Sequence, residues 1–222
     1  MKKINVKIMT VLSMLCAFSF MCVLLFRFEV GGFLTFDIKD AILAIASFIY
    51  GPLAGVVCSA LVAFLEFILI SDTGLYGFIM NFLSSATFSM VIGLIYKYKR
   101  TMMGAIIGVV IAVFSMTSVM LLANMFITPL FLGVDRQAVM GMLVPTLLPF
   151  NIIKAVFNGA LVLIIYKPIT QALKKAKLLI SGGTDNYKFG FKSVLLLIIS
   201  LMVLVAAALY LVLKMGGGVD FF

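Results

Sequence analysis

Three polar side chains, Asn151, Lys154 and Asn158, interrupt an apolar stretch over residues 145–167 that is long enough to cross a bilayer. In an α-helix they occupy positions i, i+3 and i+7, so all three project from one face. A lysine near the middle of a hydrocarbon span costs roughly 3 kcal/mol on insertion scales. Asparagine amides offer both hydrogen-bond donors and acceptors. This pattern favours the polar wall of a ligand pocket inside a helix bundle.

Two other interpretations of the same face remain open. Lys154 could extend its ammonium to a membrane interface, or the asparagines could hold this helix to a neighbour. A mostly apolar stretch separates Lys154 from Lys167, the next basic residue along the chain. That distance makes extension to an interface awkward, so the pocket is the preferred interpretation.

Composition identifies the class of protein. The chain has 222 residues, of which 64% are hydrophobic and 11% charged, so we expect one integral membrane domain. Long continuous apolar runs favour helices over an outer-membrane barrel. The sequence has no histidine, and Cys16, Cys22 and Cys58 lack metal-site spacing, so we expect no catalytic residues, resident cofactor or metal. No phosphate-binding loop is present, so this chain is not an ATPase.

The apolar runs predict an all-α membrane protein, a six-helix transmembrane bundle with an additional C-terminal transmembrane helix. The second run is short for a bilayer crossing. The predicted spans cover residues 7–26, 38–50, 53–70, 75–96, 102–128 and 145–167, with the additional run at 193–213. We expect residues 1–175 to form a substrate-binding membrane domain, 176–192 a basic cytoplasmic linker and 193–222 an extra apolar segment.

The distribution of charge predicts the orientation, because cytoplasmic loops of membrane proteins carry an excess of Lys and Arg. With the N-terminus in the cytoplasm of a bacterial cell, most basic residues fall inside. The outer side then holds Arg27, Lys39, Arg136 and Lys214 with most of the acidic residues. The net charge of +9 is spread over loops that flank lipid, which indicates membrane topology and not nucleic-acid binding.

Asn124 and Thr128 lie one helical turn apart near the outer end of the span 102–128. Asn151 and Lys154 follow at a similar depth in the next span, so we expect an outward-facing pocket between the two spans. Abundant Phe, Met and Leu would line the rest of it, which suits a flat, mostly apolar ligand with one hydrogen-bonding edge. A helix–helix hydrogen bond remains the alternative for Asn124.

Three carboxylates and one small-residue pair complete the candidates. Glu66 lies within a predicted span, where acids are often functional, but its position near the span's end favours a structural role. Asp37 and Asp40 begin a helix, and capping is favoured over metal binding or acid–base chemistry. Ser13 and Ala17 are spaced four residues apart, which permits close approach of another helix.

Five segments within residues 1–175 form a recognisable set: TFDIKD, FIYGPLAG, YKYKR, NMFITPLFLGV and LLPFNIIKAVFN. Together they resemble the riboflavin-binding S subunits of energy-coupling factor (ECF) vitamin transporters. The resemblance implies a six-helix subunit that captures the vitamin on the outer face. Its implied partners are riboflavin, membrane lipid, a transmembrane coupling subunit and two cytoplasmic ATPase subunits.

Carried over to this sequence, the resemblance implies that Asn124, Asn151 and Lys154 hydrogen-bond the polar edge of the flavin ring. The loop around Thr35 would help to close the site, and Asn158 is grouped with these substrate-binding residues. Riboflavin is the implied transported ligand, with FMN as a second candidate. The partner-docking contact would fall on Ser13 and Ala17, where serine replaces one alanine of the family pattern.

Two alternative functions remain. One is an S subunit for a different vitamin. The other is a stand-alone, ion-coupled carrier, which would require inverted internal repeats and coupling carboxylates at mid-membrane. The sequence contains no convincing repeat, and Glu66, near the end of its span, is the one candidate for such a carboxylate.

Overall fold

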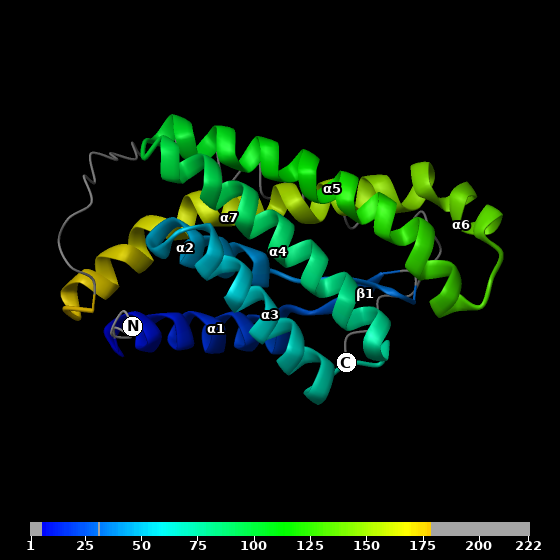
Figure 1. Cartoon of the computed structure of the whole chain (residues 1–222), viewed down its shortest axis with the longest axis horizontal. Coiled ribbons are helices and arrows are strands. Elements are labelled where there is room, and N and C mark those ends of the chain that lie inside the picture. The colour runs from blue at the N-terminus through cyan, green and yellow to red at the C-terminus, as the bar shows by residue number, and fades with distance from the viewer. Residues whose placement is uncertain (1–5, 31, 179–222) are drawn as a thin grey trace, which may run out of the picture.

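The computed structural model of the chain describes residues 6–30 and 32–178 as a helical bundle with one short β-hairpin (Figure 1). The elements in chain order are α1 (Val6–Phe26), β1 (Phe28–Val30), β2 (Leu34–Phe36), α2 (Lys39–Tyr50), α3 (Pro52–Leu69), α4 (Gly74–Tyr98), α5 (Met102–Leu132), α6 (Arg136–Met142), the π-helix η1 (Leu143–Leu147) and α7 (Leu148–Lys175). The predicted apolar segment 193–222, and nearly all of the predicted linker 176–192, lie outside the described residues.

Five stretches of the described chain are long and apolar enough to cross a membrane: α1, α3, α4, α5 and the α6–α7 stretch, Arg136–Lys175. The helical membrane fold expected from the apolar runs is therefore confirmed. Helix α2 is different, because its 12 residues reach only about 18 Å. It contacts α1, α3, α4 and α7, and every residue from Lys39 to Phe48 is buried.

Small residues allow α2, α3 and α4 to pack closely. Ser47 of α2 lies so near Gly55 and Gly93 that a Cβ atom at either glycine would collide with it. Ser59 and Ser89 join α3 to α4 through hydroxyls 3.1 Å apart. Interfaces built from small residues are typical of membrane helices, which have no hydrophobic driving force between them.

At the end of the bundle where α2 and α4 finish, three aromatic side chains meet beside a small hollow that they help to line. The ring centroids of Phe48 and Tyr96 are 4.2 Å apart, and those of Phe48 and Tyr166 are 5.2 Å apart. The hydroxyls of Tyr96 and Tyr166 lie 3.2 Å from each other. We call these three residues the aromatic cluster.

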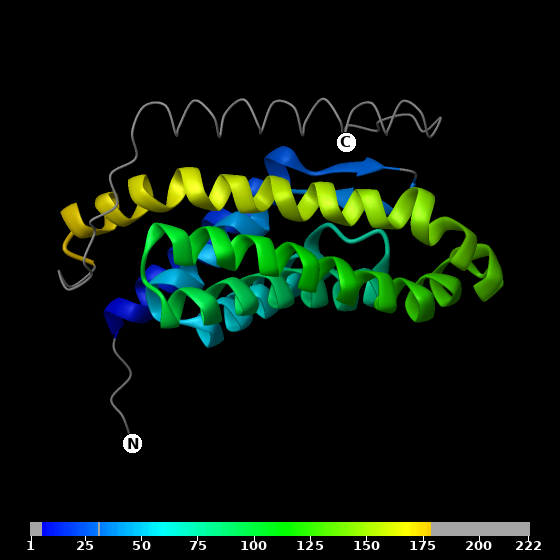
Figure 2. The ribbon, with the colours of Figure 1, turned by 90° about the horizontal axis from the view of Figure 1, so that it is seen from above.

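The segment 27–36, expected only as a connection, contains the antiparallel hairpin β1–β2, in which Phe28 pairs with Phe36. Their rings stack at 4.9 Å, and the ring of Phe36 also meets Phe150 and Phe157 of α7 edge-on. Gly32 has a φ of +78°, a conformation that glycine adopts without strain in a tight turn. The hairpin therefore lies along α7 (Figure 2).

The predicted connection 129–144 is wrong in detail, because most of it is helical. Helix α5 continues through Pro129 and ends at Gly133, whose left-handed φ of 63° is the usual helix terminator. Asp135 then caps α6 by accepting a hydrogen bond from the Arg136 backbone N–H at 3.0 Å. Helix α6 and η1 lead directly into α7.

Candidate ligand-binding site

A cavity opens at the end of the bundle that carries the hairpin. It contains about 790 Å³ of non-atom space, part of which is open to solvent. Elements α3, α4, α5, α7 and the hairpin all contribute to its wall. Its apolar lining includes Phe33, Tyr76, Met80, Met120, Ile127, Phe131 and Phe150.

Four of the five substrate-binding residues predicted from the sequence line this cavity. Thr35 comes from β2, Asn124 from α5, and Asn151 and Lys154 from α7. The pocket was expected between the fifth and sixth predicted spans. That description is incomplete, because α3 and α4 also supply a large part of the cavity wall. Asn158 is the exception: it is fully buried and is not among the lining residues.

Hydrogen bonds to the protein fix both lining amides. Asn124 Nδ2 donates to the carbonyl oxygen of Met120 at 2.7 Å, and its Oδ1 accepts from the Thr128 hydroxyl, also at 2.7 Å. Asn151 Nδ2 donates to the carbonyl oxygen of Leu147 at 2.8 Å. The Asn151 bond uses one donor, and its amide oxygen and second N–H remain for another partner.

Lys154 is buried and makes an ion pair, so the interpretation that it extends to an interface is wrong. Its Nζ lies 2.9 Å from Oδ2 of Asp37 and donates to the carbonyl oxygen of Thr35 at 3.1 Å. Because the carbonyl belongs to β2, the ammonium ties α7 to the hairpin. Lys154 also lines the cavity, so the same group stands beside any ligand there.

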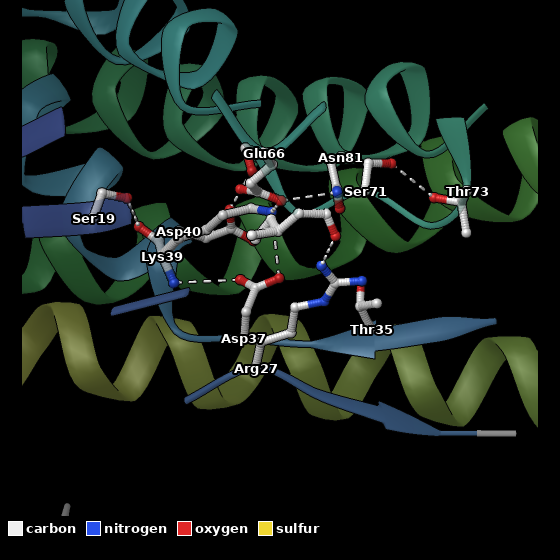
Figure 3. A network of polar contacts seen from close by, with 12 residues as sticks. Ser19, Arg27, Thr35, Asp37, Lys39, Asp40, Glu66, Ser71, Thr73 and Asn81 are labelled. Carbon is white, nitrogen blue, oxygen red and sulfur yellow. Dashed lines mark hydrogen bonds and ion pairs between the residues drawn. The ribbon is translucent and has the colours of Figure 1, made fainter. Parts of the chain in front are cut away.

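Asp37 is shared by a second buried lysine (Figure 3). Lys39 Nζ lies 3.4 Å from Asp37 Oδ2 and 2.8 Å from Glu66 Oε2. Asn81 Nδ2 donates to the same Glu66 oxygen at 2.9 Å. Lys39 is therefore buried at the start of α2, where its side chain is 1% exposed, and is not a loop charge in contact with solvent. Buried charges need such partners, because an unpaired one is strongly destabilising.

The two aspartates do not cap α2 as predicted, because its N-cap residue is Ile38, which has no side-chain capping hydrogen bond. Asp37 Oδ1 accepts a hydrogen bond from the Lys39 backbone N–H at 3.3 Å. Its other oxygen joins two ammonium groups. Asp40 is fully buried and accepts a hydrogen bond from the Ser85 hydroxyl, which connects α2 to α4. Within the described residues, no group of three or more His, Cys, Asp or Glu side chains is placed to hold a metal ion.

The side chain of Asn158 forms hydrogen bonds with backbone groups and does not line the cavity. Its Oδ1 accepts from the Ala41 backbone N–H at 2.9 Å, and its Nδ2 donates to the carbonyl oxygens of Asp37 at 2.9 Å and Lys154 at 3.1 Å. These contacts fasten the start of α2 to α7. Helical spacing correctly placed Asn158 on the same face as Asn151 and Lys154. The backbone that covers Asn158, at the start of α2, is distant in the sequence and could not be predicted from that spacing.

Sequence reasoning missed Asn81 and Ser84 and did not place Glu66 in the cavity wall, although all three line it. The signal on α4 was available, since Gly77, Asn81 and Ser84 lie at i, i+4 and i+7 and share one face. The proposed docking pair lies elsewhere: Ser13 and Ala17 are both exposed on α1, away from these contacts.

Comparison with known proteins identifies the family. The model of the family described as "ECF transporter, substrate-specific component" matches residues 7–166. This chain belongs to that family. The substrate-specific component has a solved relative, "Structure and mechanism of the S component of a bacterial ECF transporter", with a TM-score of 0.65 and 30% sequence identity. The alignment covers 76% of this chain and 98% of the relative.

Two curated relatives of this substrate-specific component have names that include a ligand. The chain is 31% identical over 180 residues to "Riboflavin transporter RibU" of Staphylococcus aureus (strain TCH60), covering 77% of this chain and 94% of the relative. It is 29% identical over 182 residues to "Riboflavin transporter FmnP" of Bacillus subtilis (strain 168), covering 77% and 93%. The resemblance to ECF S subunits is thus confirmed.

Proposed function

We propose that this substrate-specific component binds riboflavin in the cavity beside the hairpin and presents it for import by an ECF transporter. The observation that carries the proposal is the convergence of Asn124, Asn151 and Lys154 from two helices on one apolar-walled cavity. Pockets of this kind combine apolar walls with a few polar groups that fix the ligand's orientation. The names of the two relatives support the same ligand.

The chemistry of the flavin ring fits this arrangement. The isoalloxazine ring is flat and apolar on its faces, and one edge carries an imide-like alternation of donors and acceptors. The amide oxygen and free N–H of Asn151 offer the reciprocal pattern, and the Lys154 ammonium can donate to a ring carbonyl. Phe33, Phe131 and Phe150 supply aromatic surface for the ring faces.

The proposal includes the partners and the orientation expected from the sequence. The chain would work with a transmembrane coupling subunit and two ATPases, with its N-terminus in the cytoplasm and the cavity facing outward. Ser13 and Ala17 would contact the coupling subunit, and residues 1–175 would form the complete binding domain. The family supports this ATP-driven assembly over a stand-alone, ion-coupled carrier.

A direct experiment tests the ligand. The chain is purified in detergent without added vitamin and its absorbance spectrum is recorded, followed by titration of riboflavin with its fluorescence as the signal. We expect either the absorbance spectrum of co-purified flavin or, on titration, quenching of riboflavin fluorescence that saturates at one riboflavin per protein chain. A preparation that neither retains nor binds riboflavin, while another vitamin raises its melting temperature, would assign the cavity to that vitamin instead.

A further inference from the structure

Five charged side chains are buried together where the start of α2 meets α3 and α7. Three are carboxyl groups, on Asp37, Asp40 and Glu66, and two are ammonium groups, on Lys39 and Lys154; each residue is at most 4% exposed. If all five were ionised, they would carry one net negative charge. An uncompensated charge in a protein interior is strongly destabilising, so we expect one of the carboxyl groups to be neutral.

The ion pairs show which carboxyl group lacks a counter-charge. Lys39 Nζ lies 2.8 Å from Glu66 Oε2 and 3.4 Å from Asp37 Oδ2, and Lys154 Nζ lies 2.9 Å from Asp37 Oδ2. No ion pair between described residues includes Asp40. The two lysines are therefore balanced by Asp37 and Glu66, and Asp40 is the carboxyl group left over.

The hydrogen bonds of Asp40 lead to the same assignment. Its Oδ1 is bonded to the Ser85 hydroxyl of α4, while its buried Oδ2 has no hydrogen-bond partner among the described residues. Glu66 also has one unpartnered oxygen, but its Oε2 accepts from both Lys39 and Asn81, as suits an ionised carboxylate. With a proton on Oδ1, Asp40 can donate to Ser85, and Oδ2 becomes a neutral carbonyl oxygen, which is less costly to leave unpartnered.

The charged groups around Asp40 are already paired with one another. They are Asp37 and Lys39 beside the start of α2, Glu66 of α3 and Lys154 of α7. The N-terminal end of α2 favours negative charge, and Asp37 supplies it by accepting the Lys39 backbone N–H at 3.3 Å. Asp40 therefore gains no counter-charge of its own.

The other two helices that contact α2, α1 and α4, bring no charge to Asp40. Ser19 of α1 and Ser85 of α4 bond to the start of α2. The one charged residue on each helix, Lys7 or Lys97, lies 12 residues from that serine, about 18 Å along the helix. The remaining titratable groups facing α2 lie among apolar side chains; they are the thiols of Cys16, Cys22 and Cys58 and the two tyrosines of the aromatic cluster.

We infer that Asp40 carries a proton at neutral pH and that this proton balances the buried charges. Because Asp40 meets Ser85, the proton belongs to the contact between α2 and α4. Ionisation of Asp40 at high pH would place an unpaired charge in that contact and weaken it. The inference makes the α2–α4 contact sensitive to pH, and it does not depend on which ligand the cavity binds.

The dependence of stability on pH tests this inference in the full chain in detergent. An unfolded aspartate ionises at about pH 3.9, so above about pH 5 the folded chain would hold one more proton at Asp40 than the unfolded chain. Each further pH unit then lowers the parent's folding equilibrium constant about tenfold relative to Asp40→Asn, which has no such proton. We expect the melting temperature of Asp40→Asn, relative to the parent, to rise from about pH 5 to about pH 8. Asp72→Asn is the control: the Asp72 side chain is 86% exposed, so its difference from the parent should not change with pH.

Infrared spectroscopy detects the proton directly. The carbonyl stretch of a protonated carboxylic acid should be present in the parent at neutral pH, shift in D2O and be missing from Asp40→Asn. Absence of this band from the parent would overturn the inference, as would a melting-temperature difference that stays constant or falls with rising pH. A band that persists in Asp40→Asn but is lost in Glu66→Gln would place the proton on Glu66 instead.

Two further outcomes would also contradict the inference. Failure of Asp40→Asn to fold would do so, because a neutral amide of the same shape should replace a neutral acid. A parent whose melting temperature follows the sodium or potassium concentration at fixed pH would assign the charge balance to a bound cation and not to a proton.

Discussion

The ion pair between Lys154 and Asp37 connects the candidate site to the start of α2. Lys154 Nζ is 2.9 Å from Asp37 Oδ2, and the same carboxylate oxygen lies 3.4 Å from Lys39 Nζ. One aspartate therefore balances two ammonium groups, one of which faces the cavity. Removing a partner from a buried pair typically costs roughly 3–5 kcal/mol, so loss of any one of these three side chains should destabilise the protein.

The first prediction separates the two roles of Lys154. Lys154→Met should bind riboflavin much more weakly and should unfold at a lower temperature without ligand, because Asp37 then keeps only Lys39. Adding Asp37→Asn removes the excess negative charge, so the double variant should recover stability but not binding. Thermal unfolding with and without saturating vitamin measures both effects. A Met variant that keeps the parent's ligand-induced stabilisation would exclude Lys154 from the site.

The second prediction concerns Asn151. Asn151→Ala removes one or two hydrogen bonds to the flavin edge, which costs about 1–3 kcal/mol and lowers riboflavin affinity roughly tenfold to a hundredfold. The purified protein should remain monodisperse, because the bond to Leu147 lies within the first turn of its own helix. A fluorescence titration gives the affinity. Phe114→Leu, on an exposed face of α5, is the control.

Asn158 should behave in the opposite way. Asn158→Ala leaves the Ala41 N–H and the Asp37 carbonyl without their partner, so we expect a clear fall in the melting temperature. Riboflavin affinity of the folded protein should stay within about threefold of the parent, since Asn158 does not line the cavity. Loss of affinity at unchanged stability would return Asn158 to the group of ligand contacts.

The fourth prediction tests partner docking on α1. Ala17→Trp places a bulky ring on an exposed, small-residue face and should block close approach of the coupling subunit. Riboflavin binding should be unaffected, while co-purification of the coupling subunit and ATPases is lost. Leu61→Trp, on the exposed face of α3, is the matched control. Recovery of the full complex with Ala17→Trp would place the docking face elsewhere.

The fifth prediction concerns the C-terminal residues. Among the described residues, all that line the cavity precede Lys175, so truncation after Lys175 should leave riboflavin affinity unchanged. The measurement is a titration of the truncated protein after its thermal unfolding has shown that it is folded. Loss of binding in a folded truncation would assign residues 176–222 a part in the site.

The sequence was most informative where polar residues interrupt an apolar run. Asn124, Asn151 and Lys154 stand out for that reason, and helical spacing places the last two on one face. The pairing of Lys39 with Glu66 was not predictable in this way, because 27 residues and a change of helix separate them. Its position near a charged loop made Lys39 resemble a surface residue.

The hairpin escaped prediction because each of its strands has only three residues. Such strands are too short to show an alternating pattern, and packing of Phe36 against α7 stabilises them instead. The hydrogen-bond partners of Asn158 could not be predicted for a similar reason. Helical spacing predicts which face a side chain occupies, but not which distant backbone will cover that face.

The position of the aromatic cluster bears on whether ions could cross the membrane through the inside of the bundle. Its rings lie at the opposite end of the bundle from the hairpin, where they border a smaller second hollow, and none of its residues lines the ligand cavity. In the proposed orientation, each unit charge that leaked inward through the bundle would dissipate about 2.3 kcal/mol per 100 mV of membrane potential. Because the ligand cavity and the hollow beside the aromatic cluster are lined by different residues, the two are separate and do not form one continuous path along the bundle.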